Sequence, residues 1–417
     1  MTLRRTSRRS FLKTKGAAAA GLAGLQIVRG SSWAAGGPND RIGVGVIGVG
    51  GRGGYLTTCL MKLRREGLID IHGVCDVYLP RVEYWSKRAG CRPYDDWRKL
   101  LENKRIDGVV IATPDHWHAP MTIAACQAGK DVYCEKPMTY WKSIEEPKAV
   151  VRAVAEHKRV MQVGTNGMSD TIWRQARARI RTGRLGRVMQ AQASDMRNGP
   201  ISVYSPKTND GKAKPGENLN WDMWLGSAPK RPFEPGRFFA FRSFWDYSGG
   251  TCTDFLPHLL TPILYILDLG FPRRVVSSGG LYFWKDGREV PDIFTLLIEY
   301  PEGPQVYLPS GLASDVNIPK RIRGQSATMT FTGPGAVIEP QRHGVRKTKY
   351  EEIRRQRGES TVEHLRDWLT CMRTRKKPIS NEIIGYKVMV ALQMGVHSYL
   401  ENKAMLFDPE KEEYRPG

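Results

Sequence analysis

The chain has 417 residues, 41% of them hydrophobic and 25% charged, and a formal net charge of +22. This composition excludes collagen-like and wholly disordered classes, and the length is enough for two or three domains. The 7 cysteines are scattered and never spaced C-x-x-C. They predict neither a disulfide framework nor a zinc site, and we expect no bound metal.

The positive charge is concentrated in part at the start of the chain, where residues 1–34 hold several Lys and Arg and no acidic residue. The other basic runs lie far apart and match no nucleic-acid-binding module. We therefore expect a solvated basic surface and no specific nucleic-acid partner.

Residues 7–13, Ser-Arg-Arg-Ser-Phe-Leu-Lys, precede an uncharged stretch over 16–28 and resemble a twin-arginine signal. The apolar stretch is shorter than the roughly 20 residues of a membrane span, and small residues at Ser32 and Ala34 fit a cleavage site. We predict a signal peptide over 1–34, export to the periplasm or cell envelope, and no membrane span after cleavage. The alternative is a basic tail.

Next comes a dinucleotide-binding pattern. A short apolar strand over 41–47 runs into Gly48-Val49-Gly50-Gly51-Arg52-Gly53 and then a helix through Arg65. In this G-x-G-x-x-G motif, Gly48 permits a tight turn, Gly50 lets the backbone approach a pyrophosphate, and Gly53 lets the helix pack against the strand. The helix N-terminus then offers free N–H groups to the phosphates.

A second apolar strand over 69–75 ends in Asp76. A carboxylate there can accept hydrogen bonds from both ribose hydroxyls and repels a 2′-phosphate, so NAD is favoured over NADP. Arg81, five residues later, leaves NADP open as an alternative.

Strands and helices go on alternating up to Gly164. We predict strands over 106–112, 131–134 and 160–164 and helices over 119–128 and 143–157. This alternation predicts a doubly wound parallel sheet, a Rossmann domain over residues 35–164.

The pattern changes in residues 165–417. A basic amphipathic helix over 170–182, a strand over 187–195 and a polar loop over 197–220 come first; strands over 274–284, 293–300, 305–311 and 327–331 and helices over 361–375 and 381–402 follow. Successive strands without intervening helices predict an α+β domain with a large, mostly antiparallel sheet.

Two segments follow predicted strands of the first domain, where open α/β sheets hold ligands. One is Thr113-Pro114-Asp115-His116-Trp117-His118, and the other is Cys134-Glu135-Lys136-Pro137. The pair T-P-x-x-x-H and E-K-P resembles the Gfo/Idh/MocA family of glucose-fructose oxidoreductase and inositol dehydrogenase relatives, from about Arg41 to the C-terminus.

The resemblance implies an NAD(P)-dependent oxidoreductase in which Lys136 lies beside the nicotinamide and the substrate hydroxyl and assists proton transfer. Glu135 would hold Lys136 by an ion pair. The implied cofactor-binding residues are Gly48, Gly50, Arg52, Gly53, Asp76, Thr113, Pro114, His118, Glu135 and Lys136. The structural alternatives are that Lys136 only ends a strand at the surface and that the histidines only satisfy backbone groups.

Asp254 and His258 are four residues apart and would share one face of a helix. In the resembling family this D-x-x-x-H pattern places a histidine near the substrate, which implies that His258 is the general base. Asp254 would orient His258 or tune its pKa, while Lys136 stabilises the alkoxide. The alternative is a helix cap and a buried histidine. The family's second histidine and aspartate are replaced by Leu259 and Thr261, and Pro262 is expected to kink the helix.

Aromatic residues gather just before this helix. Trp221, Trp224, Phe238, Phe239, Phe241, Trp245 and Tyr247 lie there, with Arg237 and Arg242 among them. Aromatic faces beside hydrogen-bonding groups suit a sugar ring, and we predict that Trp245, Tyr247 and His258 contact the substrate. The alternative is that these aromatic side chains form core.

The first functional hypothesis is therefore an exported oxidoreductase that transfers hydride between nicotinamide and a carbohydrate or cyclic polyol, with a tightly bound NAD because the twin-arginine route exports folded proteins. A redox-neutral NAD-dependent glycosidase or lyase would use the same residues. A non-catalytic sugar-binding protein on the same fold is a third hypothesis. By the same resemblance we expect a homo-oligomer.

Overall fold

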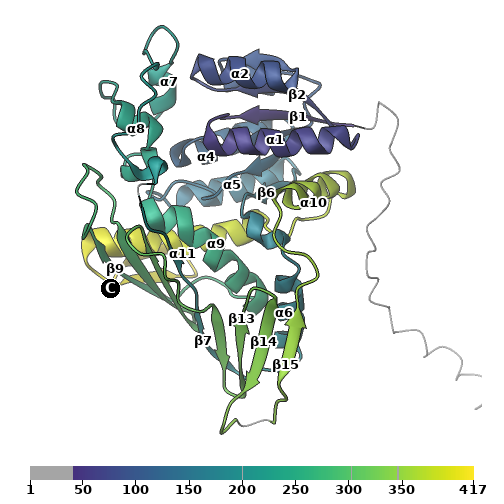
Figure 1. Ribbon diagram of the computed structural model, residues 1–417, viewed down its shortest axis with the longest axis vertical. Coiled ribbons are helices and arrows are strands. Elements are labelled where there is room, and N and C mark those ends of the chain that lie inside the picture. Colours follow the sequence, from purple (N-terminus) through teal and green to yellow (C-terminus); the bar gives the residue numbers. More distant parts are fainter. Residues whose placement is uncertain (1–40, 200, 302, 345–346) are drawn as a thin grey trace, which may run out of the picture.

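A computed structural model describes residues 41–199, 201–301, 303–344 and 347–417. The predicted signal over 1–34 lies outside the described residues. In Figure 1 the first domain lies above a large sheet, and the long helices α9 (Gly250–Leu267) and α11 (Glu382–Glu401) lie between the two.

The first domain contains a six-stranded parallel sheet in the order β3-β2-β1-β4-β5-β6. The strands are β1 (Ile42–Ile47), β2 (Ile69–Cys75), β3 (Arg92–Tyr94), β4 (Gly108–Ile111), β5 (Asp131–Cys134) and β6 (Met161–Val163). Every residue of β1 is buried, because helices cover both faces of a parallel sheet. The predicted Rossmann fold is confirmed.

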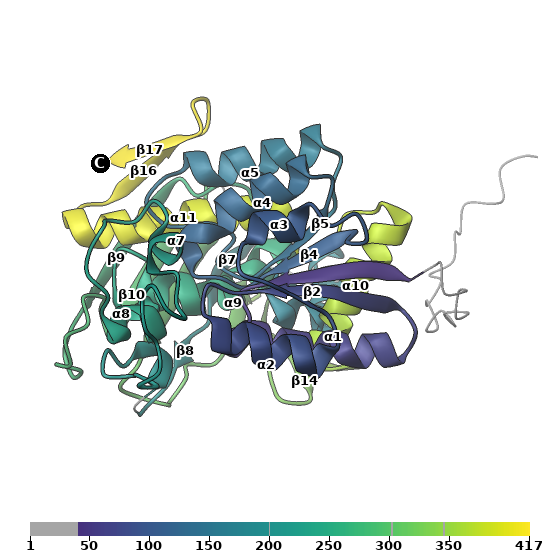
Figure 2. The same ribbon diagram turned by 90° about the horizontal axis from the view of Figure 1, so that it is seen from above.

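The covering helices lie on the two faces of this sheet, as Figure 2 shows. One face carries α1 (Gly51–Arg65) and α2 (Leu79–Ala89); the other carries α3 (Trp97–Leu101), α4 (His118–Gln127) and α5 (Glu145–Glu156). Helix α10 (Thr361–Thr374) returns from the far end of the chain and contacts α1. Its fully buried Trp368 packs beside Tyr133 of β5, with ring centroids 5.9 Å apart.

The second domain is built on a large sheet in the order β15-β14-β13-β12-β7-β11-β10-β9-β16-β17, with β8 paired to β11. Its strands are β7 (Val188–Gln192), β8 (Asp195–Met196), β9 (Arg274–Gly280), β10 (Ile293–Glu299), β11 (Gln305–Gly311), β12 (Arg321–Gly324), β13 (Ala327–Phe331), β14 (Gly335–Pro340), β15 (Glu351–Arg354), β16 (Met405–Asp408) and β17 (Glu413–Pro416). Most pairs are antiparallel, as predicted; β11 pairs in parallel with β7 and β8. Along β10, buried and half-buried residues alternate, as expected where one sheet face meets the core.

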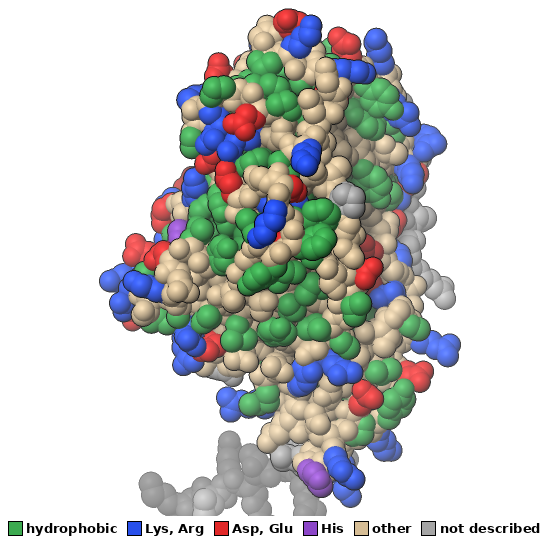
Figure 3. Space-filling model, turned by 60° about the vertical axis from the view of Figure 1, so that its left-hand side comes forward, with side chains coloured by type: hydrophobic (Ala, Val, Ile, Leu, Met, Phe, Trp, Pro, Cys, Tyr) green, Lys and Arg blue, Asp and Glu red, His purple; other side chains and the backbone are tan. Residues whose placement is uncertain are grey.

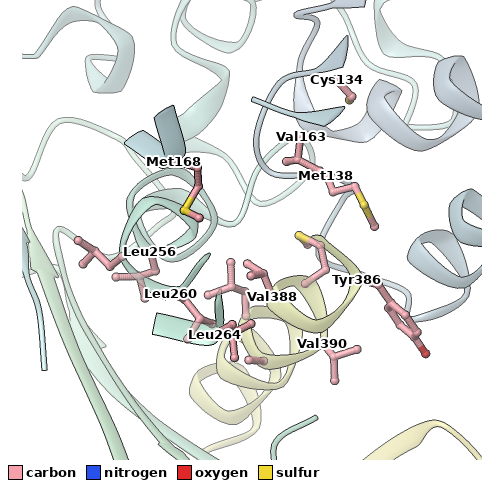
Figure 4. Packing of buried hydrophobic residues seen from close by; sticks show 14 of the residues in the cluster. Cys134, Met138, Val163, Met168, Leu256, Leu260, Leu264, Tyr386, Val388 and Val390 are labelled. Carbon is pink, nitrogen blue, oxygen red and sulfur yellow. The ribbon is translucent and has the colours of Figure 1, made fainter. Parts of the chain in front are cut away.

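Helices α9 and α11 join the two domains through one hydrophobic core, together with α6 (Ile172–Arg181). Figure 4 shows Leu256, Leu260 and Leu264 of α9 in the same core as Val388 of α11, with Met138 and Val163 of the first domain nearby. Helix α9 continues through Pro257 and Pro262 to Leu267. Leu259 and Thr261, at the positions where this chain departs from the family pattern, are both buried.

Between β8 and α9, residues 201–249 form what we call the covering segment, which contains α7 (Trp221–Leu225) and α8 (Pro235–Phe239) and lies beside α2 in Figure 1. Backbone hydrogen bonds tie this segment to the loop after β2: Leu79 N–H donates to Asn218 O at 2.9 Å, and Asn220 N–H donates to Val77 O at 2.9 Å. The covering segment therefore reaches from the second domain over the first.

On the face shown in Figure 3, Lys and Arg side chains are scattered among acidic and hydrophobic side chains. Within the described ranges, none of the helices has the length and apolar character that crossing a membrane requires.

We predict that Leu260→Ala lowers the free energy of unfolding by about 2–5 kcal/mol, because it opens a cavity in the core that joins the domains. Leu260 is 0% exposed, whereas Leu400, near the end of α11, is 45% exposed. Chemical denaturation of both variants tests this: Leu400→Ala is the control, and equal losses in the two would contradict the packing assignment.

Candidate active site

A cavity of about 330 Å³ lies between the first domain and the covering segment. The glycine turn and the loop after β2 line one part of it, and Lys136 and Asp254 line another. From the covering segment come Val203, Met223, Trp224, Phe238, Phe239, Phe241 and Arg242. The segments that the sequence predicted to form the site therefore meet around one cavity.

The glycine turn has the geometry that a dinucleotide requires. Gly48 has φ +82°, and a Cβ on Gly53 would collide with the carbonyl oxygen of Gly48. A Cβ on Gly51 would meet nothing within 4 Å. Helix α1 begins without a side-chain cap or an acidic residue in its first turn, so its N–H groups are available to an anion. This cradle fits the diphosphate of a dinucleotide.

Asp76 lies directly after β2 at the cavity wall. Its carboxylate accepts hydrogen bonds from the backbone N–H of Val49 at 2.9 Å and of Tyr78 at 3.1 Å, which fixes its orientation. Arg81 lies 4.0 Å from this carboxylate and packs over the rings of Phe238 and Phe239. Both side chains named in the choice between NAD and NADP therefore face the cavity.

Glu135 does not pair with the side chain of Lys136, which corrects the sequence-based expectation. Its carboxylate accepts a hydrogen bond from Nε of Arg52 at 2.7 Å, and Arg52 also donates to Asn166 at 3.2 Å. Burial opposes the charge of Arg52, but Glu135 raises the pKa of its guanidinium above the ordinary value. This ion pair joins the glycine turn to the Glu135-Lys136 segment, and both residues line the cavity.

Of the T-P-x-x-x-H residues, Thr113 and Pro114 line the cavity, whereas His118 is 1% exposed and lies behind it. The His118 ring nitrogens face two carbonyl oxygens, Nδ1 that of Pro137 at 2.5 Å and Nε2 that of Thr113 at 2.9 Å. Both nitrogens must then carry hydrogen, which is the charged form. Burial alone lowers the pKa of His118, but Cys134, the Asp115 carboxylate and the Pro137 carbonyl raise it to about 9.

Lys136 is held by Asp254 across the domain junction. Its ammonium donates to Oδ1 of Asp254 and, at 2.8 Å, to the backbone oxygen of the same residue. Arg242 Nε donates to the same Oδ1 at 2.9 Å, and the hydroxyl of Tyr204 donates to Oδ2 at 2.8 Å. Burial opposes the charge of Asp254, but Arg242 and Lys136 hold its pKa well below the ordinary value. Asp254 is therefore ionised and positions Lys136.

His258 lies one turn after Asp254 on α9, as the four-residue spacing predicted. It is half-buried and does not line the cavity. Burial, with the nearby Lys136, lowers the pKa of His258 to about 3, while Asp254 acts in the opposite direction. Its imidazole is therefore neutral near pH 7 and is a weak base. Asp254 affects His258 through its charge, because both carboxylate oxygens are bonded to other residues.

The predicted substrate contacts Trp245 and Tyr247 lie outside the cavity wall. Tyr247 is fully buried, with its ring 4.6 Å from that of Trp224, and Trp245 packs on Trp141. Trp221 stacks on Trp224 at 4.7 Å and is also behind the wall. The aromatic side chains that face the cavity are instead Trp224, Phe238, Phe239 and Phe241, with Trp97 and Trp117 from the first domain.

Sequence reasoning missed Tyr204 and Arg197. Tyr204 is 1% exposed and donates to Asp254, and Arg197 lines the cavity and pairs with Asp195. Both residues lie in a polar stretch without hydrophobic periodicity or a motif. Only the three-dimensional arrangement brings them to the site.

The fold and the cavity define a class: a Rossmann protein with a dinucleotide cradle and a lysine opposite it. Residues 42–165 match the oxidoreductase family with an NAD-binding Rossmann fold, and residues 173–276 match its C-terminal alpha/beta domain. Together these matches cover more than half of the chain. The chain belongs to the Gfo/Idh/MocA oxidoreductase family, which confirms the resemblance found in the sequence.

Similar proteins include an inositol 2-dehydrogenase from Rubrobacter xylanophilus, 35% identical over 31% of this chain and 36% of that protein. A glycosyl hydrolase family 109 protein from Solibacter usitatus is 36% identical over 32% of this chain and 33% of that protein. These alignments thus span about a third of each relative. A solved structure of levoglucosan dehydrogenase with NADH and levoglucosan matches with a TM-score of 0.66 and 19% identity, over 87% of this chain and 98% of that one.

The charged state of His118 predicts a pH dependence of stability. Its pKa is about 9 in the folded protein, against about 6.5 in the unfolded chain. The stabilisation is complete below pH 6.5 and is lost as the pH rises toward 9. Unfolding curves between pH 6 and 9.5 should therefore show a decrease in stability that is smaller in His118→Gln. His343→Gln, at an exposed position, is the control, and an unchanged slope in His118→Gln would contradict the assignment.

Proposed function

We propose that the protein transfers hydride between a nicotinamide dinucleotide and a CH–OH carbon of a carbohydrate or cyclic polyol. The observation that carries this proposal is the Lys136–Asp254–Arg242 cluster, which lies on the same cavity as the glycine turn and Asp76. Dehydrogenases of inositol and levoglucosan among the relatives and structural neighbours support a polyhydroxylated substrate. When bound, the nicotinamide ring supplies the hydride acceptor or donor.

The residues of this chain would handle the proton. Asp254 holds the Lys136 ammonium, which would donate a hydrogen bond to the substrate oxygen as negative charge develops there. The resemblance implies that His258 accepts the hydroxyl proton, but His258 does not line the cavity and its pKa is lowered to about 3. In this structure His258 is therefore a weak and indirect candidate for the base, and Lys136 is the group on which the proposal depends. Glu135 and Arg52 hold the backbone before Lys136 next to the glycine turn.

A redox-neutral glycosidase is the second candidate, because a glycosyl hydrolase family 109 protein is among the similar proteins over about a third of its length. In this scheme a ring hydroxyl is oxidised, the glycosidic substituent is eliminated, water is added and the ring carbon is reduced again. Incubation with a panel of glycosides separates the two. Aglycone release without net change in cofactor absorbance indicates the glycosidase; stoichiometric NADH formation indicates the dehydrogenase.

We further propose that the cofactor is retained and that the protein is exported by the twin-arginine route. The covering segment supports retention, because it is bonded to the loop after β2 and lies over the cavity. Mass spectrometry of the protein from its native cells would test both points. A dinucleotide should accompany the chain and the N-terminus should follow Ala34; an intact Met1 terminus without dinucleotide would contradict them.

Lys136→Ala should retain the dinucleotide and lose about 100- to 10,000-fold in turnover, because it removes the group closest to the reacting oxygen. Cofactor content after denaturation and initial rates measure the two effects separately. Lys142→Ala, at an exposed position on the same loop, is the control. Wild-type rates in Lys136→Ala would remove Lys136 from the mechanism.

Asp76→Ala should weaken NAD more than NADP, because the carboxylate favours the ribose hydroxyls and repels a 2′-phosphate. Titration of dinucleotide-free protein with each cofactor gives the two dissociation constants. The loss of the hydrogen bonds from Val49 and Tyr78 affects both cofactors alike. Equal weakening would therefore show that Asp76 only supports the backbone.

A further inference from the structure

Arg242 lines the cavity, and its guanidinium is bonded to a carboxylate through Nε alone. Arg242 lies in a single helical turn, Phe241–Ser243, where Nε is fixed by Asp254 at 2.9 Å and Cζ lies 4.5 Å from the centroid of the Phe241 ring. The side chain is 20% exposed and lines the cavity. Among the described residues, Nη1 and Nη2 have no hydrogen-bond partner. A guanidinium held by Nε and by a ring beneath it is oriented before a ligand binds.

A second guanidinium, that of Arg197, lines the same cavity. Asp195 holds its Nε and Nη2, each at 3.1 Å, and Cζ lies 4.1 Å above the ring of Phe255, the residue after Asp254. Asp195 balances its charge, and Nη1 has no partner among the described residues. Arg197 can therefore donate a hydrogen bond from Nη1 to a ligand, while Asp195 balances its charge.

Counted over protein side chains alone, the cavity wall has an excess of one cation at the end that holds Lys136 and Arg242, and the diphosphate of the dinucleotide belongs to the glycine turn. Arg52 pairs with Glu135, Arg81 lies 4.0 Å from Asp76, and Arg197 pairs with Asp195. The remaining charged groups on the wall are Lys136, Arg242 and Asp254, two cations that share one anion. A partly buried excess charge is costly unless a counter-charge accompanies it. A substrate with one negative charge would supply that counter-charge.

We propose that the substrate is an acidic sugar whose carboxylate binds Nη1 and Nη2 of Arg242, with Arg197 donating a further hydrogen bond. The inference rests on the proposed function, because it requires a sugar beside Lys136. A planar carboxylate matches the fork of a guanidinium, and its single charge matches the excess at the site. A sugar phosphate carries close to two charges at neutral pH and fits less well.

The test is isothermal titration calorimetry of the dinucleotide-loaded protein with matched sugars. D-Glucuronate and D-galacturonate are compared with D-glucose and D-galactose, and glucose 6-phosphate is added as the dianion. The uronates should bind at least about tenfold more tightly than the neutral sugars, and Arg242→Gln should remove about 10- to 100-fold of that affinity. Binding of the neutral sugars should change much less.

Two further variants keep the result interpretable. Arg231→Gln removes an arginine of the covering segment that does not line the cavity. Its partner Asp246 still has Arg237 at 3.6 Å, so we expect the uronate preference to stay unchanged. Arg197→Gln does not touch Asp254 and should reduce uronate affinity by a smaller factor than Arg242→Gln. If Arg242→Gln does not fold, the loss in Arg197→Gln carries the test.

Equal affinity for uronates and neutral sugars, or tighter binding of glucose 6-phosphate, would overturn the proposal. An equal loss for all sugars in Arg242→Gln would also overturn it. The protein is loaded with the reduced dinucleotide, which cannot accept hydride from these sugars, so binding is measured without turnover and this outcome is separate from the proposed function. That function fails if the cofactor absorbance changes with none of the sugars and aglycone is released from none of their glycosides, whatever the order of affinities.

Discussion

The arrangement of the site depends on one carboxylate. Asp254 lies near the start of α9, and its oxygens accept hydrogen bonds from Lys136 of the first domain and from Arg242 and Tyr204 of the covering segment. A buried carboxylate with too few donors would be protonated or expelled, but three donors and two cations keep it charged. The same contacts bring the three parts of the chain together, so Lys136 is positioned by the interface itself.

Polar contacts within the first domain also hold Lys136 in place. The Arg52–Glu135 pair links the glycine turn to the strand end that carries Lys136, and the charged ring of His118 links Thr113 to Pro137. Each of these contacts joins loops that follow different parallel strands, which is where open α/β sheets place their ligands. These polar groups, two on the cavity wall and one behind it, therefore fix the distance between the cofactor cradle and Lys136.

Sequence patterns predicted five of the six strands of the first domain and helices α1, α4 and α5, because buried parallel strands and Gly-rich turns have strong local signatures. They did not predict α2, β3 and α3, which lie between residues 79 and 101. They predicted Lys136 and Asp254 through motif resemblance, and the cavity contains both. They did not predict which aromatic residues face it: Trp245 and Tyr247 lie behind the wall, whereas Phe238 and Phe241 lie on it. Which aromatic side chains face the cavity depends on how the irregular covering segment folds over the first domain. Hydrophobic periodicity within the segment does not indicate this. The partners of Asp254, too, are up to 118 residues away in sequence.

The covering segment links cofactor and substrate in one structural unit. Its backbone is bonded beside Asp76, its aromatic side chains flank Arg81, and its Arg242 reaches Asp254. A movement that opens the cofactor end must therefore disturb residues that extend toward the substrate end, because both belong to residues 201–249. If the cofactor stays in place during turnover, the segment need not move, and the guanidinium of Arg242 remains oriented for each new substrate. Under the two proposals, retention of the cofactor and selection of the substrate would depend on the same contacts.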